Sequence, residues 1–202
     1  MGGLSFLWIS WAIWIFVTFF MKKQSPYRTK LAAALLGMII CSSFHFPIGG
    51  LDIYAGGLFA LLFCYHLLAV EKKRTIIYFF ICSYIVTAAY SALHLFEIYD
   101  PVLIIFNKDW MMAIILAYIV LILQKTLKGR LILLVSGTMQ GEILFAIVVD
   151  KLSFNYPVGS FDYLDICAIS AALILGWSFL ENARIIFETH LIVNQSEKQK
   201  SS

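Results

Sequence analysis

The sequence predicts an all-α fold: a polytopic bundle of about seven transmembrane helices, with the N-terminus outside and the C-terminus in the cytoplasm. Two observations lead to this prediction. Of the 202 residues, 61% are hydrophobic and only 13% are charged, whereas a soluble domain is about half apolar and roughly a quarter charged. The apolar residues also form long runs, separated by short segments rich in charged residues, Gly and Pro. This composition excludes a soluble enzyme domain, a disordered chain and a nucleic-acid-binding module.

Each apolar run is interpreted as a helix that crosses the membrane. A bilayer core of about 30 Å takes about 20 residues of helix, and none of the runs alternates apolar and polar residues as a barrel strand does. The expected spans are residues 4–21, 31–47, 51–70, 75–96, 110–124, 131–149 and 163–183. They form one transmembrane domain, residues 1–193, followed by a polar cytoplasmic tail, residues 194–202.

The first expected span, Leu4 to Met21, contains no charged residue. Basic residues follow it instead of preceding it, and no small-x-small cleavage site is present, so it is not read as a cleaved signal peptide. Trp8, Trp11 and Trp14 form a stripe along one side of this helix. We expect this stripe to face lipid or to pack, because tryptophan is common near membrane interfaces.

The connections between the later spans have the composition of turns. The second and third spans are joined by residues 46–50, Phe-Pro-Ile-Gly-Gly, which favours a tight antiparallel pair. The fifth span is short and follows the apolar residues 101–106 and the polar residues 107–109. The longest loop is expected over residues 150–162, before the seventh span.

The basic residues determine the expected orientation. Thirteen of the fifteen Lys and Arg residues fall on one side of this arrangement, and only Lys108 and Lys151 fall on the other. Loops with an excess of Lys and Arg stay in the cytoplasm. The N-terminus is therefore expected outside and the C-terminus inside, as an odd number of spans requires.

Glu142 is the candidate for an intramembrane polar site. It lies deep in the sixth expected span, and Thr138 and Gln140 stand beside it in the sequence. An ionisable residue at such depth is costly and commonly functional, so a proton relay, a ligand contact or a cation site is open. The alternative is a protonated Glu142 that makes one hydrogen bond between helices.

Gly137 and Gly141 form a small-x-x-x-small pair in the same span. Such a pair allows a second helix to approach closely. Packing within the chain is favoured over dimerisation, and it would also shield Glu142 from lipid.

A metal site is considered only as a weak alternative. His94 and Glu97, at i and i+3, can share one face of a helix, and His45 lies near the same expected outer side. These residues with Glu142 would offer nitrogen and oxygen ligands suited to Zn or Fe. No matching motif is present, so no metal and no cofactor are expected.

The N-terminal segment carries a family resemblance. The residues Leu7-Trp8-Ile9-Ser10-Trp11-Ala12-Ile13-Trp14-Ile15, the exit Phe19-Phe20-Met21-Lys22-Lys23 and the chain length resemble the YphA (SeaA-like) family, small multi-pass membrane proteins of spore-forming Bacillus-type bacteria. The resemblance implies a plasma-membrane protein with no known catalytic activity and a connection to spore envelope assembly. It implies no functional residues.

The function expected from the sequence is non-enzymatic: a plasma-membrane protein that assists spore or cell envelope assembly, with the lipid bilayer and other envelope membrane proteins as partners. No nucleotide-binding glycine pattern, serine nucleophile motif or catalytic histidine–acid motif occurs, and no nucleic acid is expected as a partner. The alternative is a small transporter or ligand-binding component with a polar site around Glu142. An intramembrane metalloenzyme is the third hypothesis.

Overall fold

The computed structural model describes residues 2–21, 26–48, 51–99, 107–151 and 156–200. Within these residues the chain forms seven helices and one two-stranded antiparallel hairpin. Their bounds are α1 (Leu4–Phe20), α2 (Pro26–Cys41), β1 (His45–Ile48), β2 (Leu51–Tyr54), α3 (Ala55–Ala69), α4 (Lys73–Tyr99), α5 (Lys108–Leu123), α6 (Leu127–Asp150) and α7 (Phe161–Lys200).

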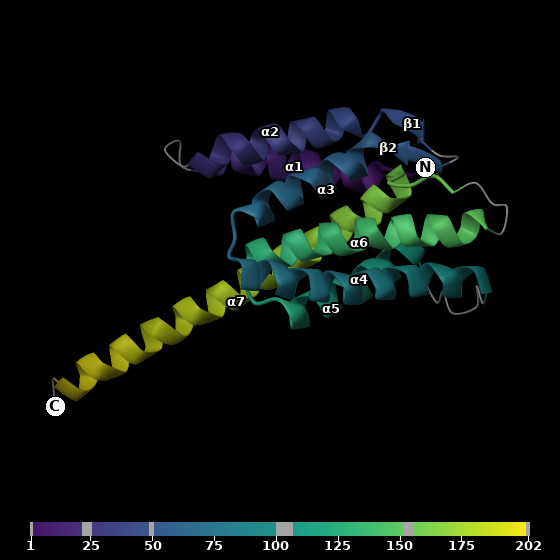
Figure 1. The fold of residues 1–202 in the computed structure, drawn as a ribbon. Coiled ribbons are helices and arrows are strands. Elements are labelled where there is room, and N and C mark those ends of the chain that lie inside the picture. Colours follow the sequence, from purple (N-terminus) through teal and green to yellow (C-terminus); the bar gives the residue numbers. More distant parts are fainter. Residues whose placement is uncertain (1, 22–25, 49–50, 100–106, 152–155, 201–202) are drawn as a thin grey trace.

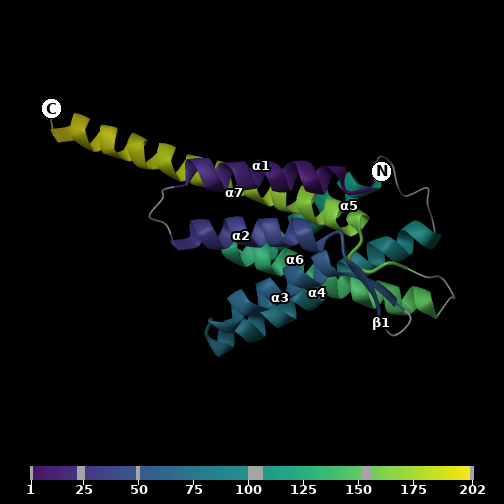
Figure 2. The same ribbon diagram turned by 90° about the horizontal axis from the view of Figure 1, so that it is seen from above.

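The helices run back and forth between two ends of one bundle (Figure 1). We call the end that carries β1 and β2 the hairpin end. The opposite end carries the described basic residues that precede α4 and α6 together with Arg184, and we call it the basic end. The N-terminus lies at the hairpin end, and α7 leaves the bundle at the basic end, where it projects well beyond the other helices (Figures 1 and 2).

Three of the described helices are long and apolar enough to cross a membrane, judged by length and composition alone. They are α4, α6 and the Phe161–Arg184 part of α7. The helices α1 and α3 are apolar but have 17 and 15 residues. At about 1.5 Å per residue they reach roughly 22–26 Å, somewhat less than the thickness of a bilayer core.

Five helices lie within about four residues of the expected spans at both ends, and α7 begins near its expected start but continues to Lys200. The helix α2 and its connection to α3 differ from the prediction. The prediction of a second span over residues 31–47 was wrong at its end, because α2 stops at Cys41. The Ser42 hydroxyl donates to the Ile39 carbonyl at 2.7 Å, and Pro47 has no N–H to continue a helix. Residues 45–54 instead pair as β1 and β2, with His45 opposite Tyr54, so the all-α prediction missed one hairpin.

Some residues named in the sequence predictions lie outside the described ranges. They are Met1, Lys22, Lys23, the turn glycines Gly49 and Gly50, residues 101–106, residues 152–155 of the longest expected loop, and Ser201 and Ser202. At the other end of the chain, α7 continues as helix through residues 194–200, where the sequence analysis placed a polar tail.

Polar side chains mark the starts of two helices. Asn107 accepts a hydrogen bond from the Asp109 backbone N–H at 3.0 Å where α5 begins. Thr126 accepts one from the Gly129 backbone N–H at 3.2 Å where α6 begins. These side chains satisfy N–H groups that a helix leaves without partners in its first turn.

The helix α6 lies at the centre of the bundle. It is the most buried of the three long apolar helices, and its largest contact is with α4, while α3, α5 and α7 also touch it. In contrast, large apolar side chains on α1, α4 and α5 are exposed, among them Trp8, Tyr84 and Tyr118. An apolar outer surface around a buried polar centre is what a lipid environment allows.

Candidate functional site

The Glu142 side chain is fully buried at the centre of the bundle. The Tyr90 hydroxyl on α4 donates a hydrogen bond to its Oε2 atom. Tyr156 and the backbone N–H of Gly159, both before α7, also interact with the carboxyl group. Glu142 is therefore enclosed by α4, by α6 and by the segment that leads into α7.

This segment, residues 156–160, folds back into the bundle at the hairpin end. Val158 is 1% exposed. Its carbonyl accepts from the Tyr54 N–H, and its own N–H donates to the Asp52 carbonyl, both at 2.8 Å. The sequence predicted only a connecting loop here. The segment is held by backbone hydrogen bonds, and such bonds leave no pattern of hydrophobic side chains in the sequence.

Gly159 allows this segment to approach so closely. Its φ of +71° lies in the left-handed region, which glycine adopts without steric cost. A Cβ at this position would lie 3.4 Å from the Met139 side chain and 3.5 Å from the Cα of Gly57. The fold thus places the segment directly over the middle of α6.

Three tyrosines and a threonine surround the carboxyl group. Tyr90 and Tyr163 meet edge to face, with ring centroids 6.3 Å apart. The Tyr163 hydroxyl shares a hydrogen bond of 3.2 Å with Thr138 Oγ1. Burial, together with the nearby Glu142, raises the pKa of Tyr156 above its ordinary value. Tyr156 therefore keeps its proton at neutral pH.

Gln140 does not join this group. Residues two apart on a helix lie on nearly opposite faces. The Gln140 Nε2 atom donates to the Tyr65 hydroxyl at 2.7 Å, and its Oε1 accepts from Ser83 and Thr87 at 3.4 Å each. The structure therefore links Thr138 to the tyrosines around Glu142 through Tyr163 and assigns Gln140 to a separate polar contact with α3 and α4.

Gly137 and Gly141 lie against α4. A Cβ on Gly137 would come within 2.6 Å of Val86, and one on Gly141 within 2.8 Å of Tyr90. Hydroxyl groups use this proximity, because Thr87 donates to the Gly137 carbonyl at 3.0 Å and Ser91 to the Gly141 carbonyl at 2.9 Å. Close approach and interhelical hydrogen bonds together stabilise helix pairs in membranes.

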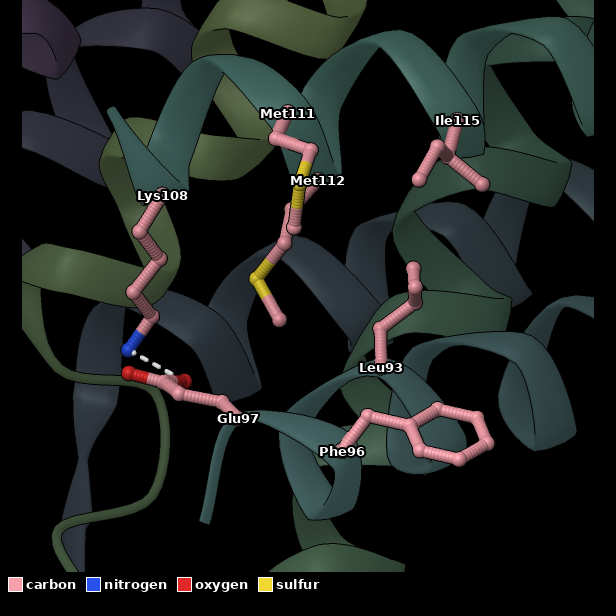
Figure 3. A pocket seen from close by; sticks show the side chains of 7 residues that line it. All are labelled: Leu93, Phe96, Glu97, Lys108, Met111, Met112 and Ile115. Carbon is pink, nitrogen blue, oxygen red and sulfur yellow. Dashed lines mark ion pairs between the residues drawn. The ribbon is translucent and has the colours of Figure 1, made fainter. Parts of the chain in front are cut away.

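His94 lies beside the site, one turn along α4 from Tyr90. It is 2% exposed, and its Nδ1 atom is 3.5 Å from Glu97 Oε2. The Lys108 Nζ atom is 2.9 Å from the same oxygen. This ion pair lines a cavity of about 180 Å³ between α4 and α5. The other side chains that line the cavity are apolar and include Leu93, Phe96 and Met111 (Figure 3).

His45 stands apart from these residues. It is exposed on β1, and its ring contacts Tyr54 at a centroid distance of 5.5 Å. Over the described part of the chain, no group of three or more His, Cys, Asp or Glu residues is placed to hold a metal ion. The three residues of the weak metal hypothesis thus divide into a His94–Glu97 pair and a separate His45.

The sequence analysis missed the tyrosine partners of Glu142. Tyr90, His94 and Glu97 follow one another at i, i+4 and i+7 in α4, which is one face of a helix. That polar stripe in an otherwise apolar span was a signal that pointed to this face. Tyr156 had no such signal, because it lies in an irregular segment.

Two buried ionic residues were also missed. Asp165 was assigned no role from the sequence, yet its carboxylate accepts from the backbone N–H groups of Gly3 and Phe6, at 2.6 Å each. Arg130 is one of the thirteen basic residues that determined the expected orientation. It is 5% exposed, and its NH1 atom donates to Glu181 at 2.7 Å and to Ser178 at 2.9 Å.

Comparison with known proteins places the whole chain in one family. A family model described as "YphA-like integral membrane protein" matches residues 2–202. The chain is 26% identical over 203 residues to "Uncharacterized protein YphA" of Bacillus subtilis (strain 168), an alignment that covers 98% of this chain and 94% of the relative. No solved structure matches the chain.

Proposed function

Because this chain belongs to the YphA-like family of integral membrane proteins, we propose that it is a non-enzymatic protein of the plasma membrane that assists spore or cell envelope assembly. The family match confirms the resemblance found in the sequence and association with a lipid bilayer. The observation that carries the proposal is α7, a helix of 40 residues that projects beyond the bundle at the basic end (Figure 1). A helical arm of this kind offers a partner an extended surface outside the membrane.

The proposed topology has seven spans, with the N-terminus outside and the C-terminus in the cytoplasm. It is supported by the alternating helix directions and by the gathering of basic residues at the end where α7 leaves. The short helices α2 and α3 are continued by the hairpin, whose backbone groups are paired. A bilayer also thins locally around short spans at modest cost.

Cysteine labelling tests this topology. With the four native cysteines replaced, a cysteine beside Lys73 should react only with a reagent given access to the cytoplasmic side, and one beside Asp162 only from outside. Labelling of both positions from the same side would contradict the proposal.

Removal of residues 185–202 tests the proposed role of α7. The shortened protein should accumulate in the membrane, because the described core lies within residues 2–184, but it should fail to support envelope integrity. A matched control replaces these residues with an unrelated helix of the same length and charge, which should fail equally. Full activity of both variants would contradict a partner contact through α7.

A second candidate function is a small transporter or ligand-binding component with its site at Glu142. It is favoured by one observation: Glu142 Oε1 is buried and, within the described part of the chain, has no hydrogen-bond partner. Replacement Glu142→Ala should remove activity, whereas Glu142→Gln keeps an acceptor for Tyr90. If both variants keep protein level and phenotype, this candidate is excluded.

A further inference from the structure

We propose that Glu97 and His94 form a proton path from the hairpin end to Glu142, and that Glu142 exchanges its proton with the medium through this path. The inference goes beyond the assembly role and does not depend on it. It deepens the second candidate, since it names the proton as the species that the polar site takes up.

The outer part of the path is a short series of charged groups. The side chains of Lys108 and Glu97 are 33% and 28% exposed, so both meet solvent or headgroups, and their charged atoms are 2.9 Å apart. Glu97 Oε2 lies 3.5 Å from His94 Nδ1. A proton taken up by Glu97 at the surface is therefore one step from a buried imidazole.

The inner part of the path is an aromatic cluster that joins His94 to Glu142. The His94 ring packs on Tyr90 with centroids 4.5 Å apart and lies 6.3 Å from Tyr156. Both tyrosines interact with the Glu142 carboxyl group. Phe145, one turn from Glu142 on α6, closes the cluster against His94 at 4.9 Å.

Two atoms in this cluster support transfer of a proton between His94 and Glu142. Within the described residues, His94 Nε2 and Glu142 Oε1 are both buried and both without a hydrogen-bond partner. Buried polar atoms nearly always have a partner, and these two belong to side chains held by the same tyrosines. They are the two ends between which a proton would pass, directly or through the Tyr156 hydroxyl.

The exchange needs no species other than a proton from the medium. Glu97 first takes up that proton. The protonated Glu97 then gives it to His94 Nδ1, while the Nε2–H bond breaks and its proton forms the O–H bond of Glu142. Imidazole suits this step because each of its nitrogens can donate or accept. The reverse sequence returns His94 to its first tautomer and releases the proton.

The surrounding charges allow Glu142 to change its protonation state. Among the described residues, the titratable groups near His94 and Glu142 are Tyr90 and Glu97 on α4, Lys108 and Asp109 on α5, Tyr163 and Cys167 on α7, and Tyr156. Lys108 is the one cation in this set, and Glu97 pairs with it. Towards the basic end, the buried α6 side chains between Arg130 and Glu142 carry no titratable group. The path therefore opens at the hairpin end.

Infrared difference spectroscopy of the full-length protein in lipid nanodiscs tests the proposal. After a pH jump, a protonated carboxyl band should change in the wild type and be missing in Glu142→Gln. His94→Phe, which keeps the ring contacts, should slow this change by about tenfold or more. His66→Phe is the matched control, because His66 is exposed on α3, and it should respond at the wild-type rate.

Two further measurements test the proposal if the His94→Phe variant does not fold. Glu97→Gln, which changes a partly exposed group, should slow the band change in the same way. In vesicles with one orientation, a pH jump at the hairpin side should act faster than one at the basic side. A Glu142 band that never responds to pH, or wild-type rates in both His94→Phe and Glu97→Gln, would overturn the proposal. Neither result would affect the α7 truncation test.

Discussion

The contact between α4 and α6 buries small and polar residues, whereas the outer face of α1 exposes large aromatic ones. Both regions are strongly apolar in sequence. The α4–α6 contact holds glycines, hydroxyl groups and Glu142, all buried. The helix α1 buries only Phe6, Ser10 and Val17, and it exposes large side chains such as Trp8 and Phe19, which are 77% and 74% exposed.

The difference shows what separates inside from outside in a chain of this kind. In lipid, burying a leucine or a phenylalanine gains little, because the surroundings are equally apolar. Helices associate through close packing and hydrogen bonds instead. Small and polar residues therefore mark the interior of this protein, and the largest aromatic residues mark much of its surface.

The largest effect is expected from the glycines of the α4–α6 contact. Gly137→Ala and Gly141→Ala should each lower the free energy of unfolding by about 1–3 kcal/mol, because their Cβ atoms would lie 2.6 Å and 2.8 Å from side-chain atoms of α4. Thermal unfolding in detergent measures this. The matched control is Gly176→Ala, where a Cβ would meet nothing within 4 Å. Equal melting temperatures for all three variants would mean that α4 and α6 do not pack in this way.

A smaller effect is expected at the polar attachment of α1 to Asp165 of α7. Asp165→Ala removes the acceptor of the Gly3 and Phe6 N–H groups and should cost about 1–2 kcal/mol, as loss of a helix cap does. Limited proteolysis between α1 and α2 should become faster. Asp150→Ala, at the exposed end of α6, should leave both measurements unchanged. An unaltered Asp165→Ala protein would show that the contact with Asp165 does not hold α1 in place.

The ion pair at the basic end should matter less. Glu181→Gln weakens the contact with Arg130 NH1 and NH2, but Glu181 is 43% exposed, so screening limits the loss to about 1 kcal/mol or less. The melting temperature should fall slightly at low salt and not at high salt. A loss that is the same at both salt concentrations would assign the effect to packing instead of charge.

The smallest effect is expected on the outer face of α1. Trp8→Leu should change stability by no more than about 0.5 kcal/mol, because this side chain is largely exposed. In lipid vesicles, brominated lipid should quench a larger share of the tryptophan fluorescence in the wild type than in Trp8→Leu. A marked loss of stability in Trp8→Leu would place another protein surface, and not lipid, against this face.

Much of the fold could be predicted from the sequence because hydrophobic runs indicate helices directly. Six helices lie within a few residues of their expected spans, apart from the extension of α7, and the burial of Glu142 followed from its depth in the sixth span. The second span was placed too far along the chain, since Phe44 to Ile48 is as apolar as a helix. Hydropathy does not distinguish such a run from a strand of a hairpin.

The sequence by itself determined the membrane class, the family, the order of the helices and the single carboxylate deep in α6. Only the tertiary structure decided which side chains meet it. It separated Gln140 from Glu142, brought Tyr90, Tyr156 and His94 to the same cluster, and showed that Asp165 and Arg130 make buried polar contacts. The physical reason is that periodicity along one helix describes its own faces. The partner of each face depends on how closely two helices approach, and here small residues and hydrogen bonds control that approach.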